Sequence, residues 1–235
     1  MSRQKEYFMV IDTETCNTLE QPLCYDIGYA VCDRQGNIVK ENSFIVAEIF
    51  FDLKDTMKSA YYAKKLPAYW EDIKEGKRQV KTLRTIRKTI LADIKEYKIR
   101  RIGAYNMNFD RKALNTTWRY VTKSFTRYFF PYGTNLFCIW NMACQTILQQ
   151  KTYIKFAMQN DLVSNADNII TSAEACYKYI TKQLDFKENH TGLEDVKIEV
   201  EIMAKCFAAH KKMEMKPKAN CWQIPQKIKK SMAEV

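Results

Sequence analysis

The sequence lacks any long apolar run and any recognisable leader segment. No stretch of 18 apolar residues occurs in the 235-residue chain, which excludes a transmembrane helix of ordinary length. The first residues lead into a predicted strand without the charged and apolar regions of a signal peptide. We therefore expect a soluble, intracellular protein, with the cytoplasm as its compartment.

Zinc-binding cysteine patterns are also missing. None of the eight cysteines forms a Cys-x-x-Cys pair; they stand at positions 16, 24, 32, 138, 144, 176, 206 and 221. Scattered cysteines of an intracellular chain are expected to be reduced and mostly buried. Histidine is scarce, with only His190 and His210 in the chain, so each imidazole has to be accounted for.

Positive charge predominates and is unevenly distributed. The chain carries 38 Lys and Arg against 27 Asp and Glu, a formal net charge of +11. Residues 74–101 hold eleven basic residues against three acidic ones, and residues 211–235 hold seven lysines against two glutamates. Such a surface favours a polyanionic partner, although a basic helix face is more often simply solvated. The second segment reads as a polar, partly mobile tail.

Residues 6–15 read Glu-Tyr-Phe-Met-Val-Ile-Asp-Thr-Glu-Thr, an apolar strand that runs into two acids. Because side chains alternate along a strand, Asp12 and Glu14 point to the same face as Phe8 and Val10. Two carboxylates so close at the end of a buried strand repel each other unless a cation lies between them, and a hard ion such as Mg²⁺ suits oxygen ligands. A solvated strand end is the alternative.

The remaining pattern alternates strands and helices. Two strands over residues 24–32 and 38–46, joined by a turn at 33–37, complete a three-stranded antiparallel meander. Residues 47–79 read as helical in pieces, interrupted by Pro67. Further predicted elements are a helix over 80–97, a strand over 101–105, a helix from about Asn108, a strand over 136–140 feeding a helix through Gln149, and a helix over 173–182 capped by Thr171 or Ser172. Strand–helix–strand connections imply parallel pairing beside the meander, and hence an α/β mixed sheet flanked by helices.

One loop, residues 124–133, is dense in aromatic residues around Arg127. Exposed aromatic rings of this kind can stack on unpaired bases. Core packing beneath a loop is the alternative use of the same residues.

Residues 190–195 read His-Thr-Gly-Leu-Glu-Asp and open an apolar helical pattern. Thr191 and Glu194 have the spacing of a capping box, with Thr191 as the N-cap. In this register His190 and Asp195 occupy two neighbouring positions across the first turn, where an apolar pair is usual. An imidazole and a carboxylate in place of an apolar pair favour a chemical role for His190 and Asp195. An ion pair at the helix start is the alternative. His210, about five turns further on, is expected on the surface or at the helix C-terminus.

Three short motifs now stand in order: Val-Ile-Asp-Thr-Glu-Thr at 10–15, Asn-Met-Asn-Phe-Asp at 106–110, and a His five residues before an Asp at 190–195. Together they resemble the motifs of the DEDDh family of 3′→5′ exonucleases, which includes polymerase proofreading subunits, ribonuclease T and oligoribonuclease. The resemblance covers about residues 6–208. It implies a ribonuclease-H-like exonuclease domain over residues 1–210, followed by the basic tail over 211–235.

The resemblance also implies roles for individual residues. Two divalent ions, Mg²⁺ or Mn²⁺, would be bound by four carboxylates: Asp12, Glu14, Asp110 and Asp195. His190 would act as the general base. The ordinary pKa of an imidazole, about 6.5, lies near neutrality, which suits a group that takes a proton from water. The terminal nucleotide would be contacted by Thr13, Thr15, Asn106 and Phe109.

The implied activity is metal-dependent hydrolysis of nucleic acid, foremost single-stranded DNA, from the 3′ end to 5′-mononucleotides. Two alternatives share the same residues: an exoribonuclease or oligoribonuclease, and a nucleic-acid-binding module that does not turn over. Nucleic acid is the expected partner, and a protein that binds the basic tail is a further option. The oligomeric state is open.

Overall fold

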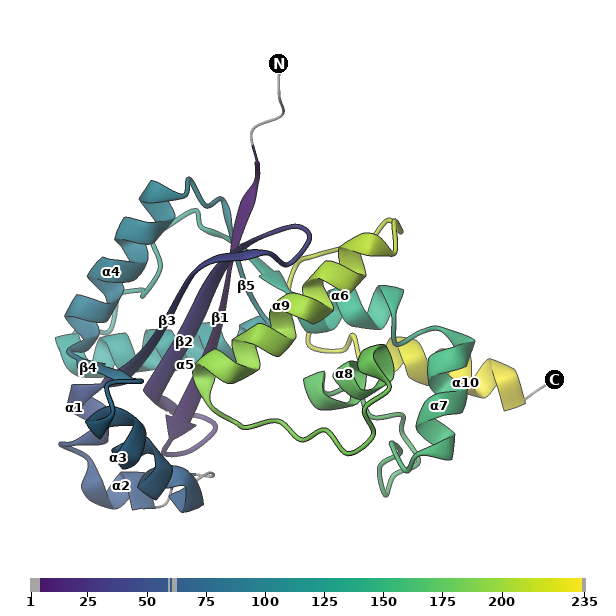
Figure 1. Ribbon diagram of the computed structural model, residues 1–235, viewed down its shortest axis with the longest axis horizontal. Coiled ribbons are helices and arrows are strands. Elements are labelled where there is room, and N and C mark those ends of the chain that lie inside the picture. The colour runs from purple at the N-terminus through teal and green to yellow at the C-terminus, as the bar shows by residue number, and fades with distance from the viewer. Residues whose placement is uncertain (1–4, 59, 61–62, 234–235) are drawn as a thin grey trace.

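The computed structural model describes residues 5–58, 60 and 63–233; residues 1–4, 59, 61–62 and 234–235, and with them the outer ends of the predicted segments 1–210 and 211–235, lie outside it. A mixed sheet of six strands forms the centre (Figure 1), in the spatial order β4-β3-β2-β1-β5-β6. The strands are β1 (Tyr7–Cys16), β2 (Leu23–Asp33), β3 (Ile38–Val46), β4 (Gln79–Lys81), β5 (Arg101–Ala104) and β6 (Asn135–Cys138). Strands β1 to β3 pair antiparallel, whereas β4 joins β3 in parallel, and β5 joins β1 and β6 in parallel. The predicted meander with parallel neighbours is therefore confirmed.

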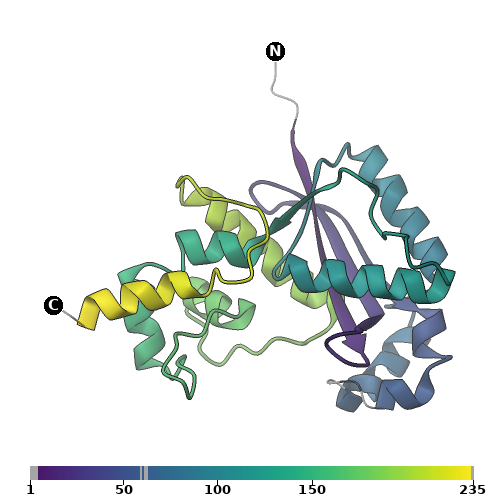
Figure 2. The same cartoon turned by 180° about the vertical axis from the view of Figure 1, so that it is seen from behind.

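Helices cover both faces of this sheet. They are α1 (Ala47–Phe50), α2 (Lys54–Lys58), the 3₁₀ turn η1 (Ala63–Lys65), α3 (Leu66–Lys74), α4 (Leu83–Glu96), α5 (Met107–Thr122), α6 (Ile139–Thr146), α7 (Lys151–Gln159), α8 (Ala173–Thr181), α9 (Gly192–Ala208) and α10 (Gln223–Ala233). Helix α9 crosses the front of the sheet in Figure 1, and α5 crosses the back, which faces the viewer in Figure 2. Alternation along β1 serves both sides: Met9 and Ile11 enter the core with α4 and α5, whereas Phe8 and Val10 enter the core with α6 and α9.

The basic C-terminal segment is folded onto the rest of the chain where the structure describes it. The Cys138 N–H donates to the Met215 carbonyl at 2.8 Å, and the Asn141 side-chain amide donates to the carbonyls of Glu214 and Lys216 at 2.9 and 2.8 Å. Further on, α10 packs against α7 in the helical lobe at the right of Figure 1. The backbone carbonyls of residues 214–216 thus accept hydrogen bonds from α6 and β6, and the partial mobility of the tail stays a prediction.

Two helix starts differ from the sequence prediction. Residues 79–81 form strand β4, so the helix predicted over 80–97 begins at Leu83, with the Thr82 hydroxyl accepting the Thr85 N–H at 3.3 Å. Three residues are too few to show strand alternation in a sequence. Pro67 lies in the first turn of α3 and does not interrupt a helix. Its missing N–H needs no partner at that position.

The second half of the chain also has two unpredicted helices, α7 and α10. The helix expected through Gln149 ends at Thr146, and α7 follows as a separate element. Of the two proposed caps of α8, Ser172 is the one used, since its hydroxyl accepts the Ala175 N–H at 3.2 Å. All eight cysteines are buried free thiols, as expected. Among the described residues, no helix combines the length and the apolar character needed to cross a bilayer.

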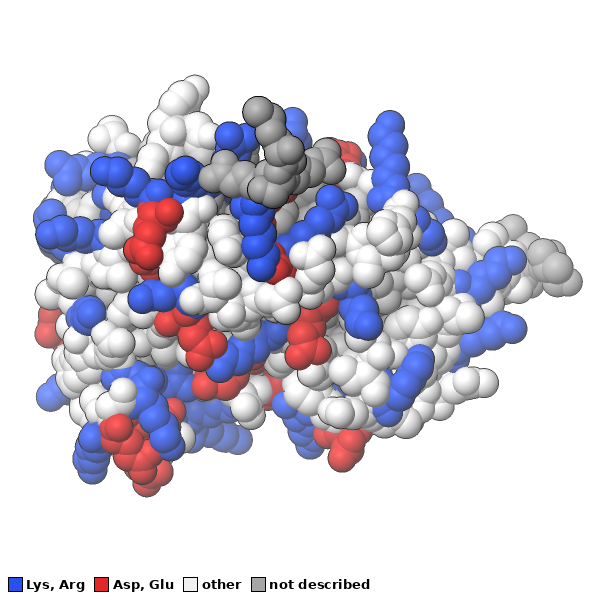
Figure 3. All heavy atoms as spheres, turned by 45° about the horizontal axis from the view of Figure 1, so that its top comes forward, with Lys and Arg blue, Asp and Glu red and all other residues white. Residues whose placement is uncertain are grey.

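Positive charge is broadly distributed over the surface. In Figure 3, Lys and Arg side chains are spread across the face in view and do not form one stripe. Within the basic segment 74–101, some cations hold the fold together: Arg78 is only 6% exposed, and the Arg87 guanidinium donates to the Phe129 carbonyl at 2.5 Å. A cluster of basic residues in the sequence is therefore not by itself a binding surface here.

Candidate metal centre

Strand β1 carries two carboxylates on the face that α9 covers. The register pairs Asp12 with Gly28 and Glu14 with Asp26 of β2. Asp12 is half-buried and Glu14 is 8% exposed. The pairing of β1 with β2 becomes irregular directly after Glu14, and such bulges often re-aim side chains beside functional sites. The predicted common face of Asp12, Glu14, Phe8 and Val10 follows from this alternation.

Two glycines bring the first turn of α9 against β2. A Cβ on Gly28 would lie 2.2 Å from the backbone of Gly192 and Leu193, and one on Gly192 would lie 2.6 Å from the Gly28 nitrogen. Only residues without a Cβ allow this approach. It places Asp195, in the first turn of α9, beside β1. Ligand oxygens of Asp12, Glu14 and Asp195 consequently all lie within 4.8 Å of one another.

Asp110 reaches the same neighbourhood from the other side of the sheet. It lies in the first turn of α5, is 3% exposed, and accepts a hydrogen bond of 2.9 Å from the Thr13 hydroxyl. Its charge raises the pKa of both Asp12 and Glu14. The structure therefore brings the four sequence-predicted carboxylates into one electrostatic neighbourhood, although they come from three elements.

A fifth acid, Glu199, was not predicted. It lies one turn after Asp195 on α9, is 4% exposed, and accepts the backbone N–H of Tyr105 at 3.0 Å. Of the neighbouring charges, it raises the pKa of Asp12 the most. An acid within the buried stripe of a helix, four residues after another candidate ligand, was the available sequence signal. Together the five acids form the carboxylate cluster: Asp12, Glu14, Asp110, Asp195 and Glu199.

Removal from water dominates the electrostatics of the carboxylate cluster. Burial, followed by the charge of Asp195, raises the pKa of Glu14 to about 8. Burial likewise raises the pKa values of Asp110 and Asp195 to about 7 each, and that of Asp12 well above its ordinary value. The Lys65 ammonium opposes this effect and lowers the pKa of Glu14 and of Asp195. The cluster thus resists ionisation near neutral pH in the absence of a stronger cation.

This donor set fits a hard divalent cation. All of its ligand atoms are carboxylate oxygens, which Mg²⁺ and Mn²⁺ prefer. Among the described residues, the buried Asp195 Oδ1 has no hydrogen-bond partner, and unpartnered buried carboxylate oxygens are costly unless a cation compensates them. The carboxylate cluster is therefore electrostatically suited to hold divalent ions.

A second group of buried charges lies beside the carboxylate cluster. The Arg78 guanidinium donates to Asp26 at 3.0 Å, to Asp72 at 2.9 Å and to Glu194 at 3.1 Å. Asp26 also accepts the Tyr69 hydroxyl at 2.7 Å and the Gly192 N–H at 3.0 Å. We call this group the arginine network: Asp26, Tyr69, Asp72, Arg78 and Glu194. It anchors the start of α9 to β2 and to the segment 47–79, to which the sequence assigned no role.

The capping box predicted at α9 forms differently. Thr191 is the N-cap residue as expected, with extended backbone angles, but its side chain makes no cap hydrogen bond to the helix backbone. Its hydroxyl instead donates to the Glu194 carboxylate. Arg78 holds that carboxylate from the other side, so Glu194 serves the arginine network in place of the box.

His190 directly precedes this cap. Its backbone has the left-handed φ of 48°, which is uncommon outside glycine and clusters at functional sites. Its backbone N–H lowers the pKa of Asp195 by hydrogen bonding, whereas its imidazole Nδ1 lies 3.8 Å from Glu188 Oε2. Burial and the Lys65 charge lower the pKa of His190 from 6.5. Glu188 is thus one carboxylate near the imidazole, and the Glu174 charge also acts on the ring. Glu188 lies in an aperiodic stretch without any sequence signal.

The remaining predicted residues flank the carboxylate cluster. Thr15 is half-buried near the end of β1, Asn106 is exposed at the N-cap position of α5, and Phe109 is half-buried in its first turn. Thr13 is 5% exposed, and its hydroxyl is already bonded to Asp110. Their assignment to the terminal nucleotide stays a prediction. His210 is exposed just beyond the end of α9, where the sequence placed it.

No protein-family model matches this sequence, and no curated protein matches it. Among solved structures, the chain is similar to exonuclease I of E. coli in its zinc-bound complex with single-stranded DNA, with 12% identity and a TM-score of 0.50 over 88% of this chain and 41% of that chain. Apo exonuclease I aligns with 13% identity and a TM-score of 0.48 over 99% of this chain and 47% of that one. The chain thus spans less than half the length of these structures. At such identity the likeness concerns the fold: an α/β, ribonuclease-H-like mixed sheet with flanking helices.

Proposed function

We propose that this protein is a metal-dependent 3′→5′ exonuclease that shortens single-stranded DNA to 5′-mononucleotides. The observation that carries the proposal is the convergence of Asp12, Glu14 and Asp195, whose ligand oxygens lie within 4.8 Å of one another at the end of a buried strand. A fold shared with exonuclease I, which has been solved with single-stranded DNA, supports the choice of substrate.

The metal would be held by the four carboxylates of the motifs, Asp12, Glu14, Asp110 and Asp195, as two Mg²⁺ or Mn²⁺ ions. When bound, such ions supply an activated water and stabilise the leaving 3′-oxygen. Burial and mutual repulsion raise the pKa values of these carboxyls. A bound cation would offset both effects by stabilising the ionised carboxylates, so the buried oxygens are suited to metal binding.

His190 would accept the proton of the attacking water. Its lowered pKa keeps the imidazole neutral at pH 7, as a base requires. Glu188, 3.8 Å from Nδ1, would orient the ring and leave Nε2 to take the proton. The backbone N–H of His190 supports Asp195 directly, so the base and a metal ligand share one turn of chain.

The terminal nucleotide would lie between the end of β1 and the start of α5. Thr13 offers only its backbone, because its hydroxyl is engaged by Asp110 at 2.9 Å. Thr15 lies two residues further along the strand, and Asn106 and Phe109 approach from the first turn of α5. These four residues would fix the 3′ end so that only terminal bonds reach the carboxylate cluster.

The test uses 5′-labelled single-stranded DNA, RNA and duplex DNA with Mg²⁺, Mn²⁺ or EDTA. We expect ladders that shorten from the 3′ end, release of 5′-mononucleotides, and no activity in EDTA. Asp195→Asn should abolish metal-dependent cleavage, whereas Asp185→Asn, at an exposed position ten residues earlier in the chain, should not. Cleavage of circular single strands or activity in EDTA would refute the proposal. Faster loss of RNA would identify an exoribonuclease, and binding without cleavage a non-catalytic module.

A further inference from the structure

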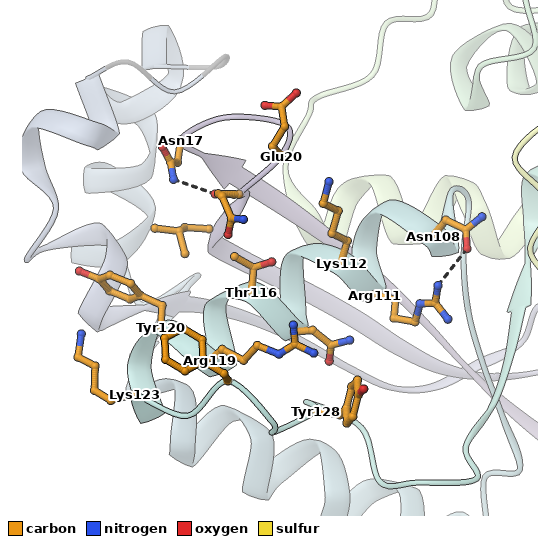
Figure 4. A pocket seen from close by; sticks show the side chains of 14 residues that line it. Asn17, Glu20, Asn108, Arg111, Lys112, Thr116, Arg119, Tyr120, Lys123 and Tyr128 are labelled. Atoms are coloured by element: carbon orange, nitrogen blue, oxygen red, sulfur yellow. Dashed lines mark hydrogen bonds between the residues drawn. The ribbon is translucent and has the colours of Figure 1, made fainter.

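A groove of about 1160 Å³ runs along the outer face of α5, separate from the carboxylate cluster (Figure 4). Its floor is one face of the helix, from Asn108 at the start to Lys123 just after the end. One wall is the connection between β1 and β2, which includes Asn17 and Glu20. The other is the aromatic loop, represented by Phe125 and Tyr128. The groove is thus bounded by three segments that are far apart in the sequence.

The charge of the groove is positive. Four cations line it, Arg111, Lys112 and Arg119 from α5 and Lys123 directly after the helix, and Glu20 is the only acid among the described lining residues. Lys112, Arg119 and Lys123 follow one another at intervals of seven and four residues, so they lie along one side of the helix. A row of positive charge in a concave surface is complementary to a polyanion.

Aromatic rings stand between these cations. Tyr120 is 39% exposed, Tyr128 is 62% exposed and Phe125 is 92% exposed. Arg119 lies 5.2 Å from the centre of the Tyr128 ring, and Lys123 lies 4.3 Å from that of Tyr120. Alternating cations and exposed rings are typical of surfaces that bind unpaired bases together with their phosphates.

The aromatic loop is held so that Tyr128 faces the groove. The Phe129 N–H donates to the Asn115 side chain at 2.8 Å, and Arg119 donates to the Arg127 carbonyl at 3.2 Å. The next two rings, Phe129 and Phe130, are buried in the core. Core packing, one of the two uses suggested by the sequence, is thus confirmed for Phe129 and Phe130, whereas Phe125 and Tyr128 remain exposed.

One end of the groove lies beside the carboxylate cluster. Asp110 stands on α5 between two groove residues, Asn108 and Arg111, but faces inward to Thr13. The opposite wall continues the strand that carries Asp12 and Glu14. From position 108 to 123 the helix is about 22 Å long, enough for up to about six stacked nucleotides.

We propose that this groove binds the single-stranded polynucleotide upstream of its 3′ end, with phosphates on the α5 cations and bases on Tyr120 and Tyr128. The proposal rests on the proposed function for its polarity, but the binding itself does not require cleavage. The protein would then contact several nucleotides at a time and not the terminal nucleotide alone.

Binding is measured in EDTA by the fluorescence anisotropy of 5′-fluorescein-labelled dT12, dT4 and rU12. Tyr128→Ala should weaken dT12 binding about 5- to 100-fold, the usual value of one base–aromatic stack. The matched control is Tyr132→Ala, an exposed ring of the same loop outside the groove, which should change binding less than twofold. dT4 should bind more weakly than dT12, and the rU12 arm shows whether the sugar is discriminated.

The phosphate contacts are tested with Lys112→Met/Lys123→Met. For single strands each lost contact flattens the slope of log K against log salt by about 0.7, so this variant should flatten it by about 1.4. The control pair Lys88→Met/Lys95→Met removes two exposed lysines of α4 and should leave the slope unchanged.

Equal losses in test and control variants, or parental binding by Tyr128→Ala, would overturn the groove assignment. Competition by poly-glutamate as strong as by dT12 would also overturn it and identify an acidic protein as the partner. The two proposals fail separately. Groove-dependent binding without any metal-dependent ladder refutes only the exonuclease, whereas normal ladders with unaffected groove variants refute only the groove.

Discussion

Two groups of acids, each centred on buried carboxylates, lie side by side in this protein and are compensated in opposite ways. Glu14 and Asp26 are direct partners in the β1–β2 ladder. Asp26 belongs to the arginine network, where Arg78, itself 5% exposed at its side chain, supplies a permanent cation. Glu14 belongs to the carboxylate cluster. Burial raises the pKa of both carboxyls, but the Arg78 charge opposes this at Asp26, whereas the charges of Asp195 and Asp26 add to it at Glu14. A carboxylate of this sheet is thus structural where the cation is built in, and available for chemistry where the cation must come from outside.

The two groups meet in the first turn of α9, where the consecutive residues Glu194 and Asp195 belong to different groups and have oppositely shifted pKa values. Arg78 and Thr191 lower the pKa of Glu194, which remains ionised. Burial raises the pKa of Asp195 to about 7. The arginine network fixes the helix start, and the helix start in turn places Asp195 and His190. Each prediction below perturbs one side of this comparison or the joint between them.

The largest effect is expected from His190→Ala. A general base contributes typically about 10²- to 10⁴-fold in rate, so turnover should fall by that factor while metal and nucleic acid still bind. In the parent, the rate at saturating metal should rise with pH through the His190 pKa, which is lowered from 6.5, and the substitution should remove this limb. His210→Ala, beyond the far end of α9, is the control and should behave as the parent. An unchanged turnover and pH profile in His190→Ala would remove His190 from the mechanism.

Arg78→Met should cause the largest loss of stability. It leaves Asp26 buried without its cation, and breaking a buried ion pair from one side costs about 3–5 kcal/mol. Chemical denaturation measures this loss. Lys77→Met, at the adjacent position with a side chain 66% exposed, should stay within about 0.5 kcal/mol of the parent. Because the uncompensated charge is the cause, Arg78→Met/Asp26→Asn should recover part of the loss; a double variant that is weaker still would contradict this account.

Gly28→Ala should disturb both groups at once. The new Cβ would lie 2.2 Å from the backbone of α9, and overpacking of this kind costs about 1–3 kcal/mol. As the helix start moves away, Asp195 should leave Asp12 and Glu14, so Mn²⁺ affinity by calorimetry should fall together with stability. A loss of stability with parental Mn²⁺ binding would show that the two groups are not coupled through α9.

The sequence predicts the parts of this arrangement that depend on local pattern. Alternation in β1 puts Asp12 and Glu14 on one face, and helical spacing with a cap places Asp195 at the start of α9. Local sequence pattern does not predict the role of Arg78 in the segment 47–79. Arg78 follows the end of a helix, and its partners Asp26 and Glu194 are 52 and 116 residues away in the sequence. Nothing local signals such a pairing.

Close approach is equally hidden in the sequence. Gly28 reads as an ordinary strand residue and Gly192 as part of a capping sequence, yet their contact decides whether α9 reaches β1. Glu199 and Glu188 become members of the site only because α9 and the chain before it fold over β1. The four motif carboxylates could be predicted because their types and order carry the chemistry; their supporting residues are set by packing alone.

The most direct test of the comparison is Glu14→Gln without metal. The folded protein raises the pKa of Glu14 to about 8 from its ordinary 4.5. Between these values the unfolded chain has lost a proton that the folded chain keeps, so the free energy of unfolding of the parent should fall as pH rises from about 4.5 to 8. Glutamine cannot ionise, and the variant should therefore gain on the parent with rising pH. The gain should therefore grow steadily between about pH 4.5 and about pH 8. Saturating Mg²⁺ or Mn²⁺ binds the ionised parent and should reverse the order of stability. Glu20→Gln, at an exposed position, should follow the parent throughout in denaturation curves taken at each pH. If Glu14→Gln follows it as well, with and without metal, the carboxylate cluster carries no uncompensated charge and does not differ from the arginine network in the way argued here.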